Sequence, residues 1–160
     1  MRVSRKIHGS LVALALAAIA LPLFAQPAGA AGVDFGLRAG AYLEDHDPFV
    51  GLELLVPMGS TDWYFNPNAE FVFADERDRA SLNFDFHYDF QKTGSYYLWA
   101  GAGLAAIHTD GDRRHDSQDD AGLNLLAGVG WRLQNLTPYA QLKVVVSDDS
   151  ELVAAVGVRF

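Results

Sequence analysis

The sequence contains no cysteine, and no long helical pattern is present after residue 30. Without cysteine the fold has no disulfide framework, which excludes the small loop-rich scaffolds that depend on one. The missing 3.6-residue period and the missing heptads argue against helical bundles and coiled coils. With 160 residues, the chain is still long enough for one domain with a full core. These absences leave an all-β domain as the expected fold class.

The N-terminal segment has the layout of a secretory signal peptide. Its three basic residues lie within the first six positions, an apolar run follows over residues 11–24, and an Ala-Gly-Ala sequence ends at Ala30. The apolar run is shorter than the roughly 20 residues that a membrane-spanning helix needs. We therefore expect residues 1–30 to be a cleaved signal peptide and residues 31–160 to form the mature domain.

Basic residues are scarce in this mature domain. The signal segment contains three of the 12 basic residues and none of the 20 acidic ones, so residues 31–160 carry a net charge of −11. Binding to phosphate backbones requires a basic surface. We therefore expect no nucleic-acid partner.

The pattern that is present is alternation with a period of two. Residues 82–90 read LNFDFHYDF, in which every second residue is apolar or aromatic. Such alternation predicts a β-strand, because successive side chains point to opposite faces. Eight segments of this kind, separated by turn signals, predict a barrel or a sandwich. They cover residues 33–43, 49–57, 63–74, 80–91, 96–108, 122–133, 138–146 and 152–160.

The connections between these segments alternate in charge. Those after the first, third, fifth and seventh segments are acidic: EDHDP, DERDR, TDGDRRHDSQDDA and SDDSE. The others are short and carry few charges: MGSTD, KTGS and QNLT. An even number of strands with long loops at one end and tight turns at the other is typical of bacterial outer-membrane barrels. The expected fold is therefore an eight-stranded antiparallel transmembrane β-barrel.

Charged residues keep to one face of every segment except the fifth, which has no charge before its end to set its register. Acidic and basic residues nearly balance on this polar face, and several glycines share it. A buried interior needs such pairing, because an isolated buried charge is costly, and small residues make room for long ones in a narrow barrel. We expect these ionisable residues inside: Asp34, Arg38, Glu53, Glu70, Asp85, His87, Asp89, Arg132, Lys143 and Arg159.

Aromatic residues gather where the segments meet the short turns, and they predict a girdle at a membrane interface. The alternative is a soluble, lipocalin-like periplasmic barrel that holds an apolar ligand and whose core these aromatics cap. The two possibilities differ in which face of the sheet is wet. The residues concerned are Phe35, Trp63, Phe65, Phe90, Tyr96, Tyr97, Trp131, Tyr139 and Phe160.

Three stretches carry a resemblance to a known family. The sequence finishes with LVAAVGVRF, in which apolar residues alternate up to Phe160, and contains YLWAGAGLAA and PYAQLKVVV in the fifth and seventh segments. It resembles the small eight-stranded outer-membrane barrels of the OmpA/OmpX/Opa type. This resemblance implies an outer-membrane location, periplasmic termini, and contact with outer-membrane lipid and lipopolysaccharide. It also implies that the barrel assembly machinery recognises the C-terminal strand ending at Phe160.

The row Asp85, His87 and Asp89 is the main candidate for chemistry in the interior. Such groups can titrate unusually when buried, but a third strong metal ligand is missing nearby in the sequence. We predict instead that the row pairs across the barrel with Arg38 or Arg132. No catalytic residue, cofactor or metal ligand is assigned, and we expect a structural or surface-interaction role that is not enzymatic.

Two further functions stay open. His115 and Ser117 form an H-x-S pair that resembles the motif of outer-membrane lipid A deacylases, so a lipid-modifying enzyme is one alternative. No Glu follows at a suitable distance. Pro67 cannot donate a backbone hydrogen bond and predicts a bulge in the third segment. A lateral opening there, similar to that of OmpW-like barrels, would make the protein a conduit for small apolar molecules.

The acidic connections carry −10 of the −11 charge. Such loops would repel lipopolysaccharide phosphates unless divalent cations bridge the two. Weak association of Ca²⁺ or Mg²⁺ with these carboxylates is therefore one hypothesis, and an ordinary solvated loop surface is the other.

Overall fold

The structure, a computed structural model, describes residues 32–74, 79–91, 94–110, 117–148 and 150–160. These residues belong to one compact unit, Gly32–Phe160. The signal peptide expected over residues 1–30 lies outside the described residues. Within the described ranges, no helix is long and apolar enough to cross a membrane.

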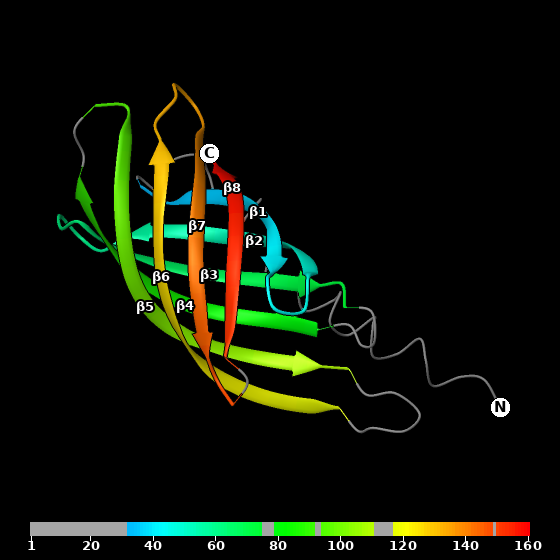
Figure 1. Ribbon diagram of the computed structural model, residues 1–160. Helices are drawn as coiled ribbons and strands as arrows, with labels where there is room; N and C mark the ends of the chain where they lie inside the picture. The colour runs from blue at the N-terminus through cyan, green and yellow to red at the C-terminus, as the bar shows by residue number, and fades with distance from the viewer. Residues whose placement is uncertain (1–31, 75–78, 92–93, 111–116, 149) are drawn as a thin grey trace, which may run out of the picture. The chain divides into compact units, whose positions relative to one another are not determined.

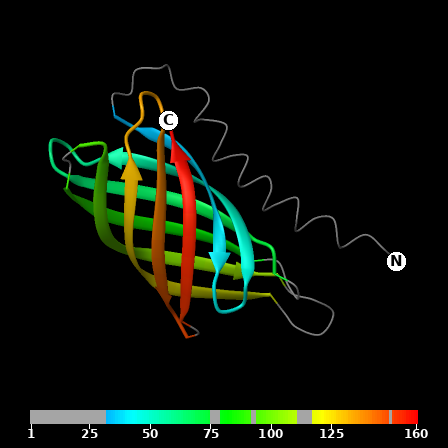
Figure 2. The same ribbon diagram turned by 45° about the horizontal axis from the view of Figure 1, so that its top comes forward.

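Eight strands form one closed barrel, in which each strand pairs antiparallel with its neighbour in the chain. The last strand pairs with the first, so the two lie side by side (Figures 1 and 2). The predicted fold class is confirmed. The strands are β1 (Asp34–Tyr42), β2 (Asp47–Pro57), β3 (Trp63–Val72), β4 (Arg79–Gln91), β5 (Tyr96–Thr109), β6 (Gln118–Trp131), β7 (Thr137–Val146) and β8 (Glu151–Arg159).

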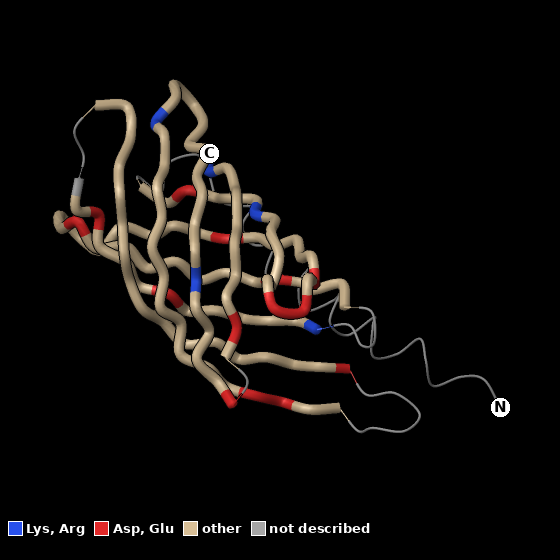
Figure 3. The backbone as a smooth tube through the Cα atoms, in the orientation of Figure 1, with Lys and Arg blue, Asp and Glu red and all other residues tan. Residues whose placement is uncertain are grey.

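The connections lie at two opposite ends of the barrel. We call the end with the connections after β1, β3, β5 and β7 the loop end, and the other end, where β1 begins and β8 ends, the turn end. Acidic residues gather at the loop end, at the connections after β1 and β7 and where β5 and β6 meet their loop (Figure 3). The described residues of the acidic connections therefore share one end of the barrel.

The predicted contrast in length is only partly right. The connections after β1 and β7 span four residues each, 43–46 and 147–150, and are no longer than the turn at 58–62. Pairing between β5 and β6 continues to Thr109 and Gln118. Residues expected in the longest loop therefore belong to β6, because backbone pairing extends beyond the apolar pattern.

The barrel is apolar outside and polar inside. Along β4, Phe84 and Phe86 are exposed at 47% and 41%, whereas Asp85 and His87 between them are fully buried. A soluble barrel requires the opposite arrangement, because water would contact the apolar face. The lipocalin-like alternative is therefore excluded, and the outer surface suits a lipid bilayer.

Strand β5 is the one whose register the sequence left open. Tyr97 and Trp99 point inward and are buried, while Leu98 between them is exposed. Each ring lies opposite a glycine of β6, Trp99 opposite Gly128 and Tyr97 opposite Gly130. A Cβ atom at either glycine would collide with the ring that it faces. The glycines of the polar face thus make room for aromatic rings as well as for the predicted Arg and Glu side chains.

The predicted aromatic girdle needs one correction. Tyr97 and Tyr139 lie inside the barrel, where they are 4% and 2% exposed. Adjacent residues of a strand point to opposite faces, so Tyr96 and Tyr97 cannot both face lipid. Tyr139 faces inward because Gly157 opposite leaves room for its ring. The exposed members at the turn end are Trp63, Phe90, Tyr96, Trp131 and Phe160.

The predicted bulge at Pro67 is also wrong. The pairs between β2 and β3 keep the same register on both sides of Pro67, although Leu54 and Leu55 form no pair with β3. Pro67 itself pairs with Phe84 of β4. The missing N–H therefore removes pairing on one side of β3 without inserting a residue.

Replacement of Gly128 by alanine tests whether the glycine makes room for Trp99. We expect the free energy of unfolding to fall by about 1–3 kcal/mol, the usual cost of overpacking. Ala127→Val adds volume at the neighbouring exposed position and should change this free energy by less than about 0.5 kcal/mol. Urea unfolding of both variants in lipid vesicles gives the comparison, and equal destabilisation would contradict the assignment.

Candidate functional site

Glu53 on β2 and Glu70 on β3 hold the buried cations of the interior. Arg159 Nε donates to Glu53 Oε1 at 2.7 Å, and Lys143 Nζ donates to both carboxylate oxygens of Glu70 at 3.1 Å. Arg38 lies 3.6 Å from Glu53 Oε2 and 3.2 Å from Glu70 Oε1. All five side chains are at most 1% exposed. We call these five residues the interior ion-pair network.

Two ionisable residues that were predicted inside the barrel, Arg132 and Asp34, are exposed to solvent. Arg132 follows the last residue of β6 and is exposed, with its guanidinium carbon 4.7 Å from the centroid of the Tyr97 ring. Asp34, the first residue of β1, is also exposed. Both lie at the turn end, where the strands begin or end and side chains reach water. Among the described interior residues, three cations thus remain with the carboxylates Glu53, Glu70, Asp85 and Asp89.

Asp85 is held by amides. Its two carboxylate oxygens accept hydrogen bonds from Asn68 Nδ2 at 3.0 Å and from Asn124 Nδ2 at 2.7 Å. For Asp85 the predicted pairing with Arg38 or Arg132 is therefore wrong, because its hydrogen bonds come from amides and Arg38 pairs with the two glutamates. The sequence could not distinguish these partners, since all the candidates share the polar face.

His87 is packed between aromatic rings. Its ring centroid lies 5.5 Å from that of Tyr64 and 5.6 Å from that of Trp99. His87 Nε2 is 3.6 Å from Asp89 Oδ1, which is longer than a hydrogen bond. The residue is fully buried, so it has no contact with a substrate approaching from water. Its placement is that of an interior packing residue.

The interior is closed by aromatic and basic side chains at the turn end. The Arg159 guanidinium carbon lies 4.3 Å from the centroid of the Tyr139 ring and 5.2 Å from that of Trp99. Arg159 Nη1 also donates to Tyr97 Oη at 3.3 Å. These side chains, held by cation–π contacts and a hydrogen bond, fill the interior at the turn end.

A second set of contacts closes the interior at the loop end. Tyr42 Oη donates to Glu70 Oε2 at 2.8 Å, and the Arg79 guanidinium carbon lies 4.3 Å from the centroid of the Tyr42 ring. Arg79 Nη1 in turn donates to Glu151 Oε1 at 2.8 Å. None of these three residues was predicted inside from the sequence. Tyr42 is four residues from Arg38 on β1, and Arg79 is six residues from Asp85 on β4, so each shares a face with a residue that was predicted inside. The alternation along each strand could therefore have predicted that Tyr42 and Arg79 point inward.

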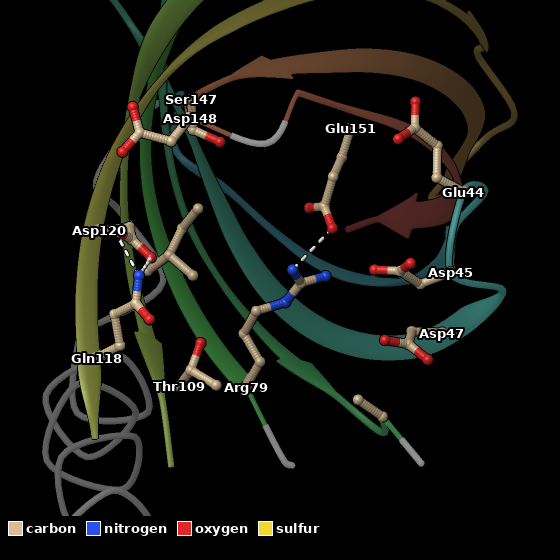
Figure 4. Close-up of a pocket in the computed structure, with 12 residues that line it drawn as sticks. Glu44, Asp45, Asp47, Arg79, Thr109, Gln118, Asp120, Ser147, Asp148 and Glu151 are labelled. Carbon is tan, nitrogen blue, oxygen red and sulfur yellow. Dashed lines mark hydrogen bonds and ion pairs between the residues drawn. The ribbon is translucent and has the colours of Figure 1, made fainter. Parts of the chain in front are cut away.

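A cavity of about 450 Å³ opens at the loop end beside the Arg79–Glu151 pair (Figure 4). Ile107, Thr109 and Gln118 line one part of it. The rest of the lining is rich in carboxylates, which come from the connections after β1 and β7 and from the beginnings of β2, β6 and β8. We call its six carboxylates the acidic rim: Glu44, Asp45, Asp47, Asp120, Asp148 and Glu151.

The rim is not a preformed metal site. Within the part of the chain that the structure describes, no group of three or more His, Asp or Glu side chains could hold a metal ion. Asp120 is engaged by Gln118 Nε2 at 3.1 Å, and Glu151 is paired with Arg79. Two of the six carboxylates of the rim thus already have protein partners.

An exposed histidine and aspartate pair lies at the loop end of β5 and β6. His108 Nδ1 and Asp119 Oδ1 are 2.6 Å apart, because their strands place them directly opposite each other. This pair was not predicted from the sequence, in which its members are 11 residues apart. Of the predicted H-x-S pair, Ser117 is exposed just before β6, and His115 lies outside the described residues.

Solved structures with this barrel are known. The N-terminal β-barrel domain of Pseudomonas aeruginosa OprF matches with a TM-score of 0.69 and 19% identity, over 80% of this chain and 95% of that one. The barrel has the fold of small outer-membrane proteins. Neisserial surface protein A matches with a TM-score of 0.55 and 16% identity, over 79% of this chain and 92% of its own.

The outer membrane enzyme PagL also shares this fold, with a TM-score of 0.58 and 16% identity, over 79% of this chain and 98% of its own. No protein-family model and no curated protein matches the sequence. An outer-membrane barrel can thus be a surface protein or an enzyme, and the fold alone does not choose between them. The outer-membrane location itself agrees with the apolar outer face of this barrel.

The ion-pair network can be tested at Glu70. Glu70→Gln preserves the shape of the side chain but leaves Arg38 and Lys143 short of counter-charge, so we expect a loss of about 3–5 kcal/mol in the free energy of unfolding. Glu44→Gln changes the same charge at an exposed position of the rim and should cost less than about 0.5 kcal/mol. Urea unfolding measures both, and similar values would refute the role of Glu70.

Proposed function

We propose that this protein is a closed, non-enzymatic outer-membrane barrel that acts as a structural element or in surface contact, with the acidic rim as its contacting part. The observation that carries this proposal is the continuous set of buried contacts from Glu151 at the loop end to Arg159 at the turn end. An eight-stranded barrel is just wide enough for its own side chains. A solute therefore has no open path through this interior.

The position of the two termini supports the proposal that the acidic rim lies on the outer surface of the cell. Strand β1 begins and β8 ends at the turn end, and in outer-membrane barrels the short turns face the periplasm. The loop end then faces lipopolysaccharide. The described carboxylates at this end outnumber the basic side chains, which suits a partner that carries positive charge.

Lipid and the assembly machinery are the partners proposed for the wall of the barrel. Large apolar side chains such as Leu104 and Val156 are 60% and 61% exposed and suit contact with acyl chains. Phe160 is half-exposed, and its backbone N–H and C=O bond to Phe35. A paired final strand with an exposed aromatic supports recognition by the barrel assembly machinery.

The absence of enzymatic activity belongs to the same proposal. The polar side chains Asp85 and His87 are sealed inside the barrel, away from lipid and water. For the alternative based on His115 and Ser117, the test is the mass spectrum of lipid A from cells with and without the protein. We expect the same acylation pattern in both, and a loss of an acyl chain that depends on Ser117 would establish the enzyme.

Conductance tests the closed interior directly. Purified protein inserted into planar bilayers should give no stable, large open channels, because the interior ion-pair network occupies the lumen. Heat-denatured protein and protein-free bilayers serve as controls for leakage. Long-lived openings of uniform size from the folded protein would overturn the proposal of a closed barrel.

Divalent cations test the acidic rim. In vesicles that contain lipopolysaccharide, Mg²⁺ should raise the thermal unfolding midpoint by about 2–4 °C relative to chelator, as weak binding to the folded state does. The double variant Asp45→Asn/Asp148→Asn should lose most of this rise. Asp34→Asn, an exposed carboxylate at the turn end, should retain it. Equal midpoints with and without chelator for the unmodified protein would count against bridging.

A further inference from the structure

The pairing of β2 with β3 is interrupted within the wall of the barrel. Pairing of β2 with β3 stops after Glu53 and resumes at Val56 without a change of register. Four residues therefore face one another across the two strands without forming pairs. We call these four residues the seam: Leu54 and Leu55 on β2, and Asn66 and Pro67 on β3.

Pro67 explains why the seam exists. The unchanged register places Leu54 opposite Pro67, and proline has no N–H to donate. On its other side β3 stays attached to β4, where Pro67 pairs with Phe84. Only the β2 side of the strand loses its partner, so the backbone carbonyl of Leu54 is left without the donor that a residue other than proline would supply.

The side chain of Asn66 replaces the missing donor. Asn66 Nδ2 donates to the carbonyl oxygen of Leu54 at 2.6 Å. The same amide lies 3.3 Å from Glu53 Oε2, and Asn66 is 1% exposed. A carbonyl within the membrane has no water to bond to. The contact therefore satisfies a backbone group of the wall with a side chain from the interior.

We propose that Asn66 is a latch that closes the seam, and that the seam is where the wall of the barrel opens first. The hydrogen bond to Glu53 connects this latch to the interior ion-pair network. Glu53 is held by Arg38 and Arg159, so the buried charges also fix the side chain that seals the wall. When the latch is released, β2 and β3 part at the seam while β3 remains paired with β4.

Hydrogen exchange resolved to single residues by NMR tests the latch in the folded protein. Asn66→Leu keeps the approximate size of the side chain and removes the donor. We expect the backbone amides of Leu54 and Val56, which point toward β3, to exchange about tenfold faster, the effect of losing one hydrogen bond. The amide of Leu55 points toward β1 and should change little. Amides in the β6 and β7 pairing should change less than about twofold.

Asn124→Leu is the matched control. Asn124 is also a fully buried asparagine, but its Nδ2 bonds to Asn83 Oδ1 and Asp85 Oδ1 and to no strand carbonyl. This variant should leave exchange at the seam unchanged even if it destabilises the barrel. Equal acceleration at the seam in both variants would mean that the seam reports only global stability, and would overturn the proposal.

Pro67→Ala supplies a test that does not depend on the folding of Asn66→Leu. Alanine restores an N–H opposite Leu54, so this single variant should slow exchange at the seam amides. In the Pro67→Ala background, Asn66→Leu should have little effect, because the carbonyl then has a backbone donor. Seam exchange that Pro67→Ala leaves unchanged, or an undiminished effect of Asn66→Leu in that background, would contradict the assignment.

Discussion

A charge enclosed by the barrel wall has to find its partner inside the barrel, and the rest of the structure depends on this constraint. Glu53 and Glu70 each meet two cations, and Arg38 lies between the two carboxylates. Breaking one pair would leave a buried charge uncompensated. The pairs join β1, β2 and β3 to β7 and β8, so the constraint also supports the closure of the sheet between the first and last strands.

The remaining interior space is filled around this network. Toward the turn end, Tyr97, Trp99 and Tyr139 surround Arg159, and glycines on the facing strands leave the volume that the rings need. Toward the loop end, Tyr42 connects Glu70 to Arg79. Asn66 extends the polar interior into the wall itself. Interior and wall are therefore stabilised together.

The charged residues of the barrel fall into two groups, a buried set in the interior and a more exposed set in the acidic rim. The buried charged residues contact one another, whereas Glu44, Asp45 and Asp148 at the loop end are exposed. The same fold carries an enzyme and surface proteins among the solved structures. The role of this chain therefore follows from its residues and their contacts rather than from the barrel alone.

The sequence by itself determined the all-β class, the number of strands and the face that turns inward, because the period of two is a local property that each strand shows independently. It also determined most of the buried charges. It did not determine the partners: Asp85 was expected to meet an arginine and meets Asn68 and Asn124, and Tyr97 was expected to face lipid and lies inside. Only the tertiary structure decided these, because pairing across a closed barrel depends on register, on the glycines opposite and on where each strand ends.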